Sequence, residues 1–179
     1  PGQTQETGLY GAIQRKLAWD APENQQAVNT PLRFLICPAH AGGLPMAAST
    51  YYLGLAGVGK DAAQLPLASP DAGMFGYERV VHREDLEEPA SRGMNTTALV
   101  AESDSDIGFW AEGGPATVRG LDPAIRPYSG PGRPFGGLHA GVTNVLFVSG
   151  SVDAIADDVD PVVFQNMLRI HAPVAAKGK

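Results

Sequence analysis

Cysteine is nearly absent from this sequence of 179 residues, in which Cys37 is the single example. One cysteine excludes an internal disulfide framework and any zinc site built from several cysteines. Isolated cysteines usually serve as small buried apolar side chains, and we expect this role for Cys37.

Positive charge is also scarce. Lys and Arg total 13 against 19 Asp and Glu, which gives a formal net charge of −6. Binding to nucleic-acid phosphates requires clustered cations, so we expect no nucleic-acid partner. Long hydrophobic runs are missing too: no stretch of 18 apolar residues predicts a membrane-spanning helix, and no secretory signal is visible.

Glycine and proline are abundant, with Gly 22 and Pro 15. Apolar residues make up 44% of the chain, which is enough to build a core. The length suits one domain, which we place over residues 1–179. Together these features predict a turn-rich α+β fold with long Gly/Pro-rich loops.

Helical periodicity is confined to short stretches near the two ends. A helix over residues 7–19 is predicted from the spacing of its apolar side chains, Leu9, Ile13 and Leu17. Asp20 and Pro22 indicate a second short helix over residues 23–28. Asp160 followed by Pro161 is the same cap-and-proline signal, and it predicts a short amphipathic C-terminal helix.

Short runs of branched and aromatic residues predict strands at 32–37, 49–56, 75–81 and 97–102. The clearest signal comes later, where two alternating runs at 143–148 and 151–156 flank Ser149-Gly150. This pattern predicts a β-hairpin with a two-residue turn. We therefore expect an antiparallel sheet of about four to six strands.

Residues 103–137 are the longest stretch without a periodic pattern, and such stretches within a domain are often functional. The part of this loop at 109–135 begins and ends at Phe109 and Phe135 and carries aromatic side chains. One hypothesis is an extracellular glycan- or solute-binding site made by Trp110, Tyr128 and Phe135. The alternative is that these rings anchor the loop to the core.

Carboxylates alternate at one end of the predicted strand 97–102. Glu102, Asp104 and Asp106 together offer oxygen ligands of the kind that calcium prefers. The stretch lacks the twelve-residue calcium loop with its glycine and terminal glutamate, so a solvated acidic loop is the alternative.

His139 is the most informative single residue. It is either a ligand or base, or a histidine that holds its loop against the hairpin by hydrogen bonds. No second histidine lies near it in sequence, so a metal site would need distant ligands.

No coherent catalytic set appears. The candidates for a hydrolase triad are Ser149, His139 and Asp153 or Asp157. They lack the G-x-S-x-G turn that such a nucleophile requires. Residues 54–60 have the spacing of a phosphate-binding loop, but Asp61 replaces its Ser/Thr and no helix pattern follows. We predict a non-enzymatic protein without an obligatory cofactor, with calcium as the one candidate ion.

Residues 133–170 resemble the C-terminal region of a large planctomycete-type family of secreted, pseudopilin-like proteins. That family carries a His-x9-Asp-Gly signature, whose region corresponds here to His139, Gly141, Asn144, Ser149 and Gly150. Two positions depart from the pattern, because Val142 replaces a glycine and Ser149 replaces the aspartate. Segments 34–38, 51–59, 73–77 and 110–123 are also similar to family motifs.

The resemblance implies a pilin-like head, in which an N-terminal helix packs on an antiparallel sheet. The membrane half of that helix is missing from the sequence at hand. A type II secretion or type IV pilin-like role would follow, with an extracytoplasmic location and membrane contact only through the missing helix. The partners would be other pilin-like subunits or further copies of the chain, and the signature residues would be structural.

Overall fold

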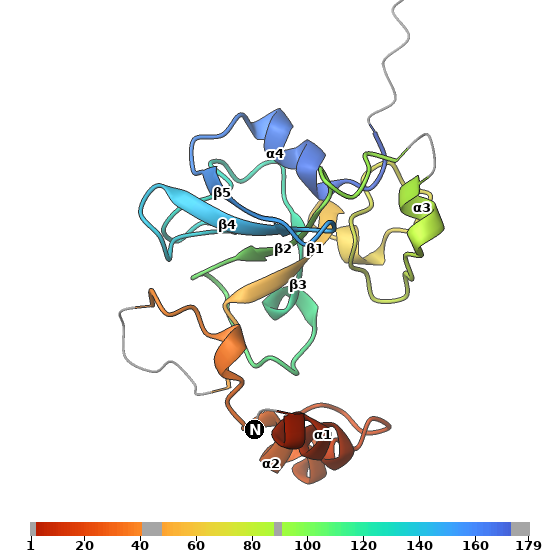
Figure 1. Cartoon of the computed structure of the whole chain (residues 1–179), viewed down its shortest axis with the longest axis vertical. Coiled ribbons are helices and arrows are strands. Elements are labelled where there is room, and N and C mark those ends of the chain that lie inside the picture. Colours follow the sequence, from red (N-terminus) through yellow and green to blue (C-terminus); the bar gives the residue numbers. More distant parts are fainter. Residues whose placement is uncertain (1–2, 41–47, 88–90, 173–179) are drawn as a thin grey trace, which may run out of the picture.

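The fold is known from a computed structural model, which describes residues 3–40, 48–87 and 91–172. It is α+β, as predicted, and is built on one five-stranded sheet in the order β3-β1-β2-β4-β5 (Figure 1). In chain order the strands are β1 (Tyr52–Val58), β2 (Ala98–Glu102), β3 (Val118–Leu121), β4 (Val142–Phe147) and β5 (Val152–Ala156).

The sheet is mixed and not antiparallel throughout, which corrects the sequence prediction. β1 runs parallel to β3, whereas the pairs β1–β2, β2–β4 and β4–β5 are antiparallel. β3 was missed because it has four residues, one of them Gly120, inside the stretch predicted to be irregular. The strand is recognisable only from the structure, in which Arg119 and Leu121 are buried and the strand pairs with β1.

Two predicted strands are absent from the described structure. Within residues 32–37 the chain instead forms the short 3₁₀ helix η2 (Arg33–Leu35), and residues 75–81 form an irregular loop. Arg79 explains the second case, because its guanidinium donates hydrogen bonds to the carbonyls of Ala56, Ala62, Leu65 and Phe75. Side-chain bonds to these carbonyls replace the strand ladder that the apolar pattern predicted.

The helices are short: α1 (Gln3–Ala12), α2 (Gln25–Val28), α3 (Arg83–Glu87) and α4 (Pro161–Leu168). Four 3₁₀ turns accompany them, η1 (Pro22–Asn24), η2, η3 (Ala62–Gln64) and η4 (Gly114–Ala116). None of the helices in the described part of the chain has the length and apolarity needed to cross a bilayer.

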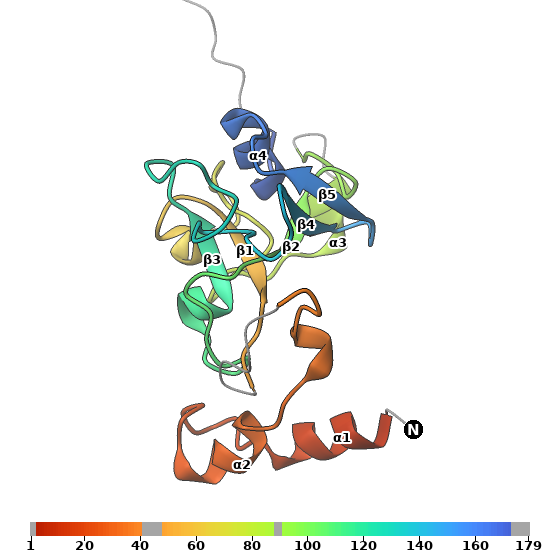
Figure 2. The same ribbon diagram turned by 90° about the vertical axis from the view of Figure 1, so that its left-hand side faces the viewer.

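The first helix ends well before residue 19, where the periodicity placed its end. The buried side chain of Asn24 accepts a hydrogen bond from the Gln14 N–H at 2.7 Å and donates to the Ala18 carbonyl at 2.8 Å. Residues 14–18 bend around this amide instead of continuing the helix. α1 and α2 lie beyond one end of the sheet, far from α4, so the expected packing of an N-terminal helix on the sheet is not observed (Figure 2).

The core lies between the sheet and α4, which packs against β1 and β2. Phe164 of α4 contacts the rings of Tyr128 and Phe135, with centroids 5.9 and 5.7 Å apart. From β4, Val145 and Phe147 point into the same cluster, as the alternation in the sequence predicted. Residues from the long loop therefore complete a core that one helix alone would not cover.

The hairpin between β4 and β5 is confirmed, but its turn is longer than two residues. The Phe147 N–H bonds to the Ser151 carbonyl, and the Gly150 N–H bonds to the Phe147 carbonyl. Three residues, 148–150, thus form the loop, with Gly150 at φ +88°. A turn closed by a left-handed glycine is the usual three-residue hairpin connection. The hydroxyl of Ser149 accepts a bond from the Ser151 N–H at 3.4 Å.

The glycines at residues 54–60 match the spacing of a phosphate-binding loop, but they serve a different purpose. Gly54 and Gly57 lie within β1, which is followed by η3 and not by a nucleotide-binding helix. A Cβ atom at Gly57 would collide with the carbonyl oxygen of Asp71, and one at Gly54 would overlap the ring of Phe75. The glycines allow the following loop to cross β1 at close range.

Asp160 caps α4 by accepting hydrogen bonds from the N–H groups of Val162 and Val163 at 2.7 and 3.2 Å. We predict that Asp160→Ala lowers the free energy of unfolding by about 1 kcal/mol, because the first turn loses its acceptor. In a domain of this size that loss corresponds to a fall in Tm of about 2–4 °C. Asp160→Asn keeps a capping oxygen and is the matched control, and equal melting of all three proteins would contradict the assignment.

Candidate functional site

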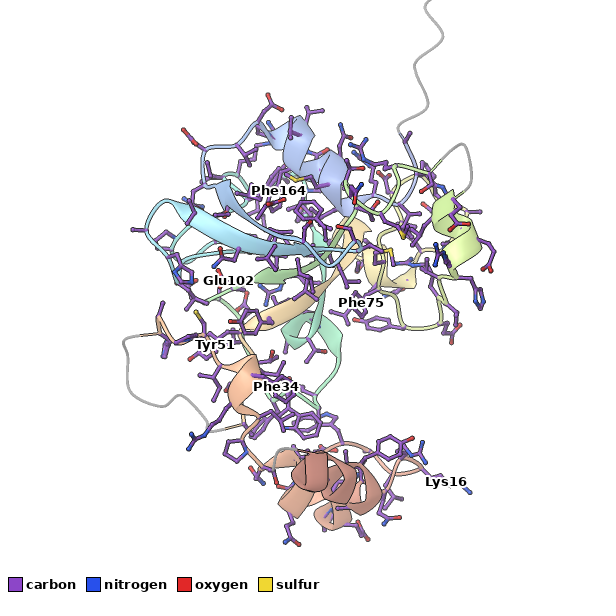
Figure 3. The ribbon with its side chains drawn as sticks, in the orientation of Figure 1. Lys16, Phe34, Tyr51, Phe75, Glu102 and Phe164 are labelled. Carbon is purple, nitrogen blue, oxygen red and sulfur yellow. The ribbon has the colours of Figure 1, made fainter. Side chains whose placement is uncertain are left out.

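Three side chains that are far apart in sequence meet at the end of the central strand β2. Cys37 follows η2, Glu102 is the last residue of β2, and His139 precedes β4. Their ligand-type atoms, Sγ, Oε1 and Nε2, all lie within 4.8 Å of one another. We call these residues the Cys–Glu–His cluster; Figure 3 labels Glu102, which lies on the side of the sheet opposite Phe164.

β-sheet register places the carboxylate of Glu102 beside Asn144. Ala101 of β2 pairs with Val145 of β4. Because the two strands are antiparallel, Glu102, which follows Ala101, lies beside Asn144, which precedes Val145. The Asn144 backbone N–H donates to Glu102 Oε2 at 3.0 Å, and its side-chain amide donates to Oε1 at 3.0 Å. Two fixed donors therefore hold a carboxylate whose residue is only 2% exposed.

The cluster is compact. His139 Nε2 lies 3.2 Å from Glu102 Oε1 and 3.5 Å from Cys37 Sγ, and the third separation, Sγ to Oε1, is 3.8 Å. The side chain of His139 keeps 33% of its surface exposed, so the cluster is open to solvent on that side. Cys37 is buried, as predicted, but it faces polar groups and not the apolar core.

Two tyrosines adjoin the cluster. Burial, together with the nearby Cys37 and Glu102, raises the pKa of Tyr52 to about 12. Burial is also the main cause that raises the pKa of Tyr51, with a smaller contribution from Cys37. The hydroxyl of Tyr51 is buried and has no hydrogen-bond partner within the described part of the chain. The surroundings thus disfavour ionisation of the two tyrosine hydroxyls.

The arrangement differs from a cysteine–histidine catalytic relay. In such a relay one ring nitrogen faces the nucleophile and the other is oriented by a third group. Here the same nitrogen of His139 faces both Cys37 and Glu102. The three atoms converge on one point instead of forming a chain, which is a geometry for ligation or for cross-linking segments.

The residues that resemble the family signature divide between two places. His139 and Asn144 both bind Glu102, as described above. Gly141 lies in the tight turn before β4, at φ +77°. Ser149 and Gly150 form the hairpin loop beyond the other end of β4. The signature therefore has one part at the cluster and one part in a turn.

The three carboxylates proposed for calcium do not form a site in the described structure. Glu102 turns toward Cys37 and His139, and it forms its metal-type cluster with them and not with Asp104 or Asp106. Asp104 accepts a hydrogen bond from the Gly132 N–H at 3.3 Å. Asp106 has a left-handed backbone at φ +48° and lies beside the hydroxyl of Ser105. Alternating positions in a loop did not bring the three side chains to one point.

The aromatic residues of loop 109–135 serve mainly as anchors. Tyr128 and Phe135 are buried in the core against α4. The indole N–H of Trp110 donates to the Thr30 carbonyl at 3.1 Å, which ties the loop to the N-terminal part of the chain. As they lie, Tyr128 and Phe135 present no ring face to a ligand.

Arg119 organises this loop and was not recognised from the sequence. Its residue is buried, and its five N–H groups have five acceptors, which are the hydroxyl of Ser103 and the carbonyls of Ser105, Asp106, Pro115 and Pro134. Burial lowers the pKa of the guanidinium, and the charge of Asp106 partly offsets this effect. An arginine in a stretch without periodicity carries no sequence signal of such a role.

Comparison with protein-family models, with curated proteins and with solved structures finds no significant match for the chain.

The variant Arg119→Lys tests whether the guanidinium of Arg119 orders the loop. A lysine has three donors on a single nitrogen and cannot reach five acceptors arranged around a planar fork. We expect the free energy of unfolding to fall by roughly 3 kcal/mol, because several carbonyls lose charged donors. Chemical denaturation measures the change. Arg126→Lys, at an exposed position of the same loop, is the control, and an equal loss in both variants would contradict the assignment.

Proposed function

We propose that this chain is a non-enzymatic, exported, pseudopilin-like subunit that acts through protein contacts. The observation that carries the proposal is the position of His139 and Asn144, which lie where the family signature has its His and Asn. Both bind the buried carboxylate of Glu102 and connect the loop before β4 to β2. That arrangement gives the signature a structural role, as expected of a subunit.

The N-terminal part of the chain is the proposed contact region. α1 and α2 lie at the end of the molecule opposite α4, and η2 lies between them and the sheet (Figures 1 and 2). Tyr10 and Phe34 are more than half exposed there, and Leu17 is nearly half exposed. The family resemblance implies that an assembling helix precedes this region, so partner subunits would lie next to it.

In-cell photo-crosslinking tests this proposal in the source organism. A benzophenone amino acid at Phe34 samples the contact region, whereas the same group at Val162 of α4 samples the opposite end at similar exposure. We expect higher-mass adducts at position 34, few at position 162, and recovery of the protein in the extracytoplasmic fraction. A cytosolic protein that forms no adducts at either position would contradict the proposal.

The second candidate function is a module that binds a glycan or small solute. A cavity in the structure supports it. The cavity has a volume of about 570 Å³ and lies beside β3, η3 and parts of residues 103–137. Its lining includes charged and polar groups such as Lys60, Asp61, Tyr77, Arg119 and Asp122. The predicted aromatic residues Trp110, Tyr128 and Phe135 are not among the lining residues.

The two functions differ in their response to small ligands. We expect that no member of a panel of oligosaccharides, amino acids and organic acids at millimolar concentration raises Tm, because the subunit acts through protein contacts. A ligand that raises Tm in the wild type, but not in Lys60→Ala or Tyr77→Ala, would favour the binding module. Gln25→Ala, at an exposed position of α2 outside the cavity, is the control.

A further inference from the structure

The Cys–Glu–His cluster has the geometry of a zinc site. Bond lengths of about 2.3 Å to sulfur, 2.0–2.1 Å to nitrogen and 2.0–2.2 Å to oxygen, at tetrahedral angles, place the ligand atoms about 3.5 Å (S to N), 3.4 Å (N to O) and 3.6 Å (S to O) apart. The corresponding separations here are 3.5, 3.2 and 3.8 Å. Each separation agrees with the value for a tetrahedral zinc ion to about 0.2 Å.

Charge favours the same conclusion. Glu102 is buried, no Lys or Arg within the described part of the chain forms an ion pair with it, and its neighbour His139 is charged only when protonated. Burial of a carboxylate without a permanent counter-charge is costly. A divalent cation bound by a thiolate, a carboxylate and a neutral imidazole has a net charge of zero. The Cys37 thiol would release its proton to solvent on binding.

The surroundings hold the ligands as metal sites require. Asn144 fixes both oxygens of Glu102, and such outer hydrogen bonds orient first ligands in known metal centres. The buried hydroxyl of Tyr51 and the buried Nε2 of His40 lack partners in the described structure. His40 belongs to the same turn as Cys37, because its N–H bonds to the Cys37 carbonyl. The rings of His40 and Tyr51 pack against each other, with centroids 4.7 Å apart, so two unpaired polar side chains adjoin the turn that holds Cys37.

We propose that Cys37 Sγ, Glu102 Oε1 and His139 Nε2 bind one zinc ion, with a fourth position open to water. Sulfur and imidazole ligands select zinc over calcium, which takes oxygen ligands. The ion joins the turn after η2, the end of β2 and the loop before β4, and it therefore stabilises the connection between the N-terminal part and the sheet. The site differs from the Glu102–Asp104–Asp106 set predicted for calcium, and it does not depend on the proposed subunit function.

Calorimetric titration of the chelator-treated full chain with zinc chloride tests this site. We expect one zinc per chain with a Kd below about 1 µM. Excess zinc should raise Tm by about 5 °C or more, since the ion binds only the folded state. Calcium chloride should do neither. Failure of zinc to bind, or calcium binding at one per chain in its place, would overturn the proposal.

Variants locate the ion. Cys37→Ser, Glu102→Gln and His139→Ala should each weaken zinc binding by more than about 100-fold, whereas Asn144→Ala, which alters only an outer contact, should weaken it about 10–100-fold. His82→Ala, at an exposed position in the turn before α3, should bind like the wild type. Unchanged affinity in folded Cys37→Ser and His139→Ala would place the zinc elsewhere and overturn the assignment.

Cobalt provides a readout that does not depend on the folding of a variant. Co²⁺ bound to the wild-type chain should show a thiolate-to-metal charge-transfer band in the near ultraviolet and intense visible bands typical of tetrahedral coordination. Zinc should displace both and should protect Cys37 from alkylation. Stoichiometric cobalt without a charge-transfer band would show that Cys37 is not a ligand.

Discussion

The burial of the Glu102 carboxylate is the constraint on which the rest of the structure depends. A charge taken out of water must be matched by donors or by counter-charge. The matching groups come from three segments, the turn at Cys37, the loop at His139 and the strand residue Asn144. One side chain at the end of β2 therefore connects these three segments.

The same principle accounts for the loop-rich architecture. A chain with few ladder bonds leaves many backbone carbonyls that need donors. The guanidinium of Arg119 supplies them in residues 103–137, and that of Arg79 supplies them around η3. Asn24 has the corresponding role in the N-terminal part. Polar side chains here replace secondary structure as the means of ordering the chain.

The convergence of three ligand-type atoms is the basis of the zinc proposal. One imidazole nitrogen faces both a thiol and a carboxylate, so the three groups could share one ion. Such a centre would cross-link the N-terminal part to the sheet, next to the exposed surface at Phe34. Rigidity at that junction would suit a subunit whose contacts are made there.

The sequence by itself determined the elements whose signals are local. The hairpin around Gly150 and the helix that begins at Pro161 follow from turn glycine, capping aspartate and alternation, all of which act within a few residues. Only the tertiary structure decided the parallel strand β3 and the meeting of Cys37, Glu102 and His139. These depend on contacts between residues up to 102 positions apart, which leave no periodic trace in the chain.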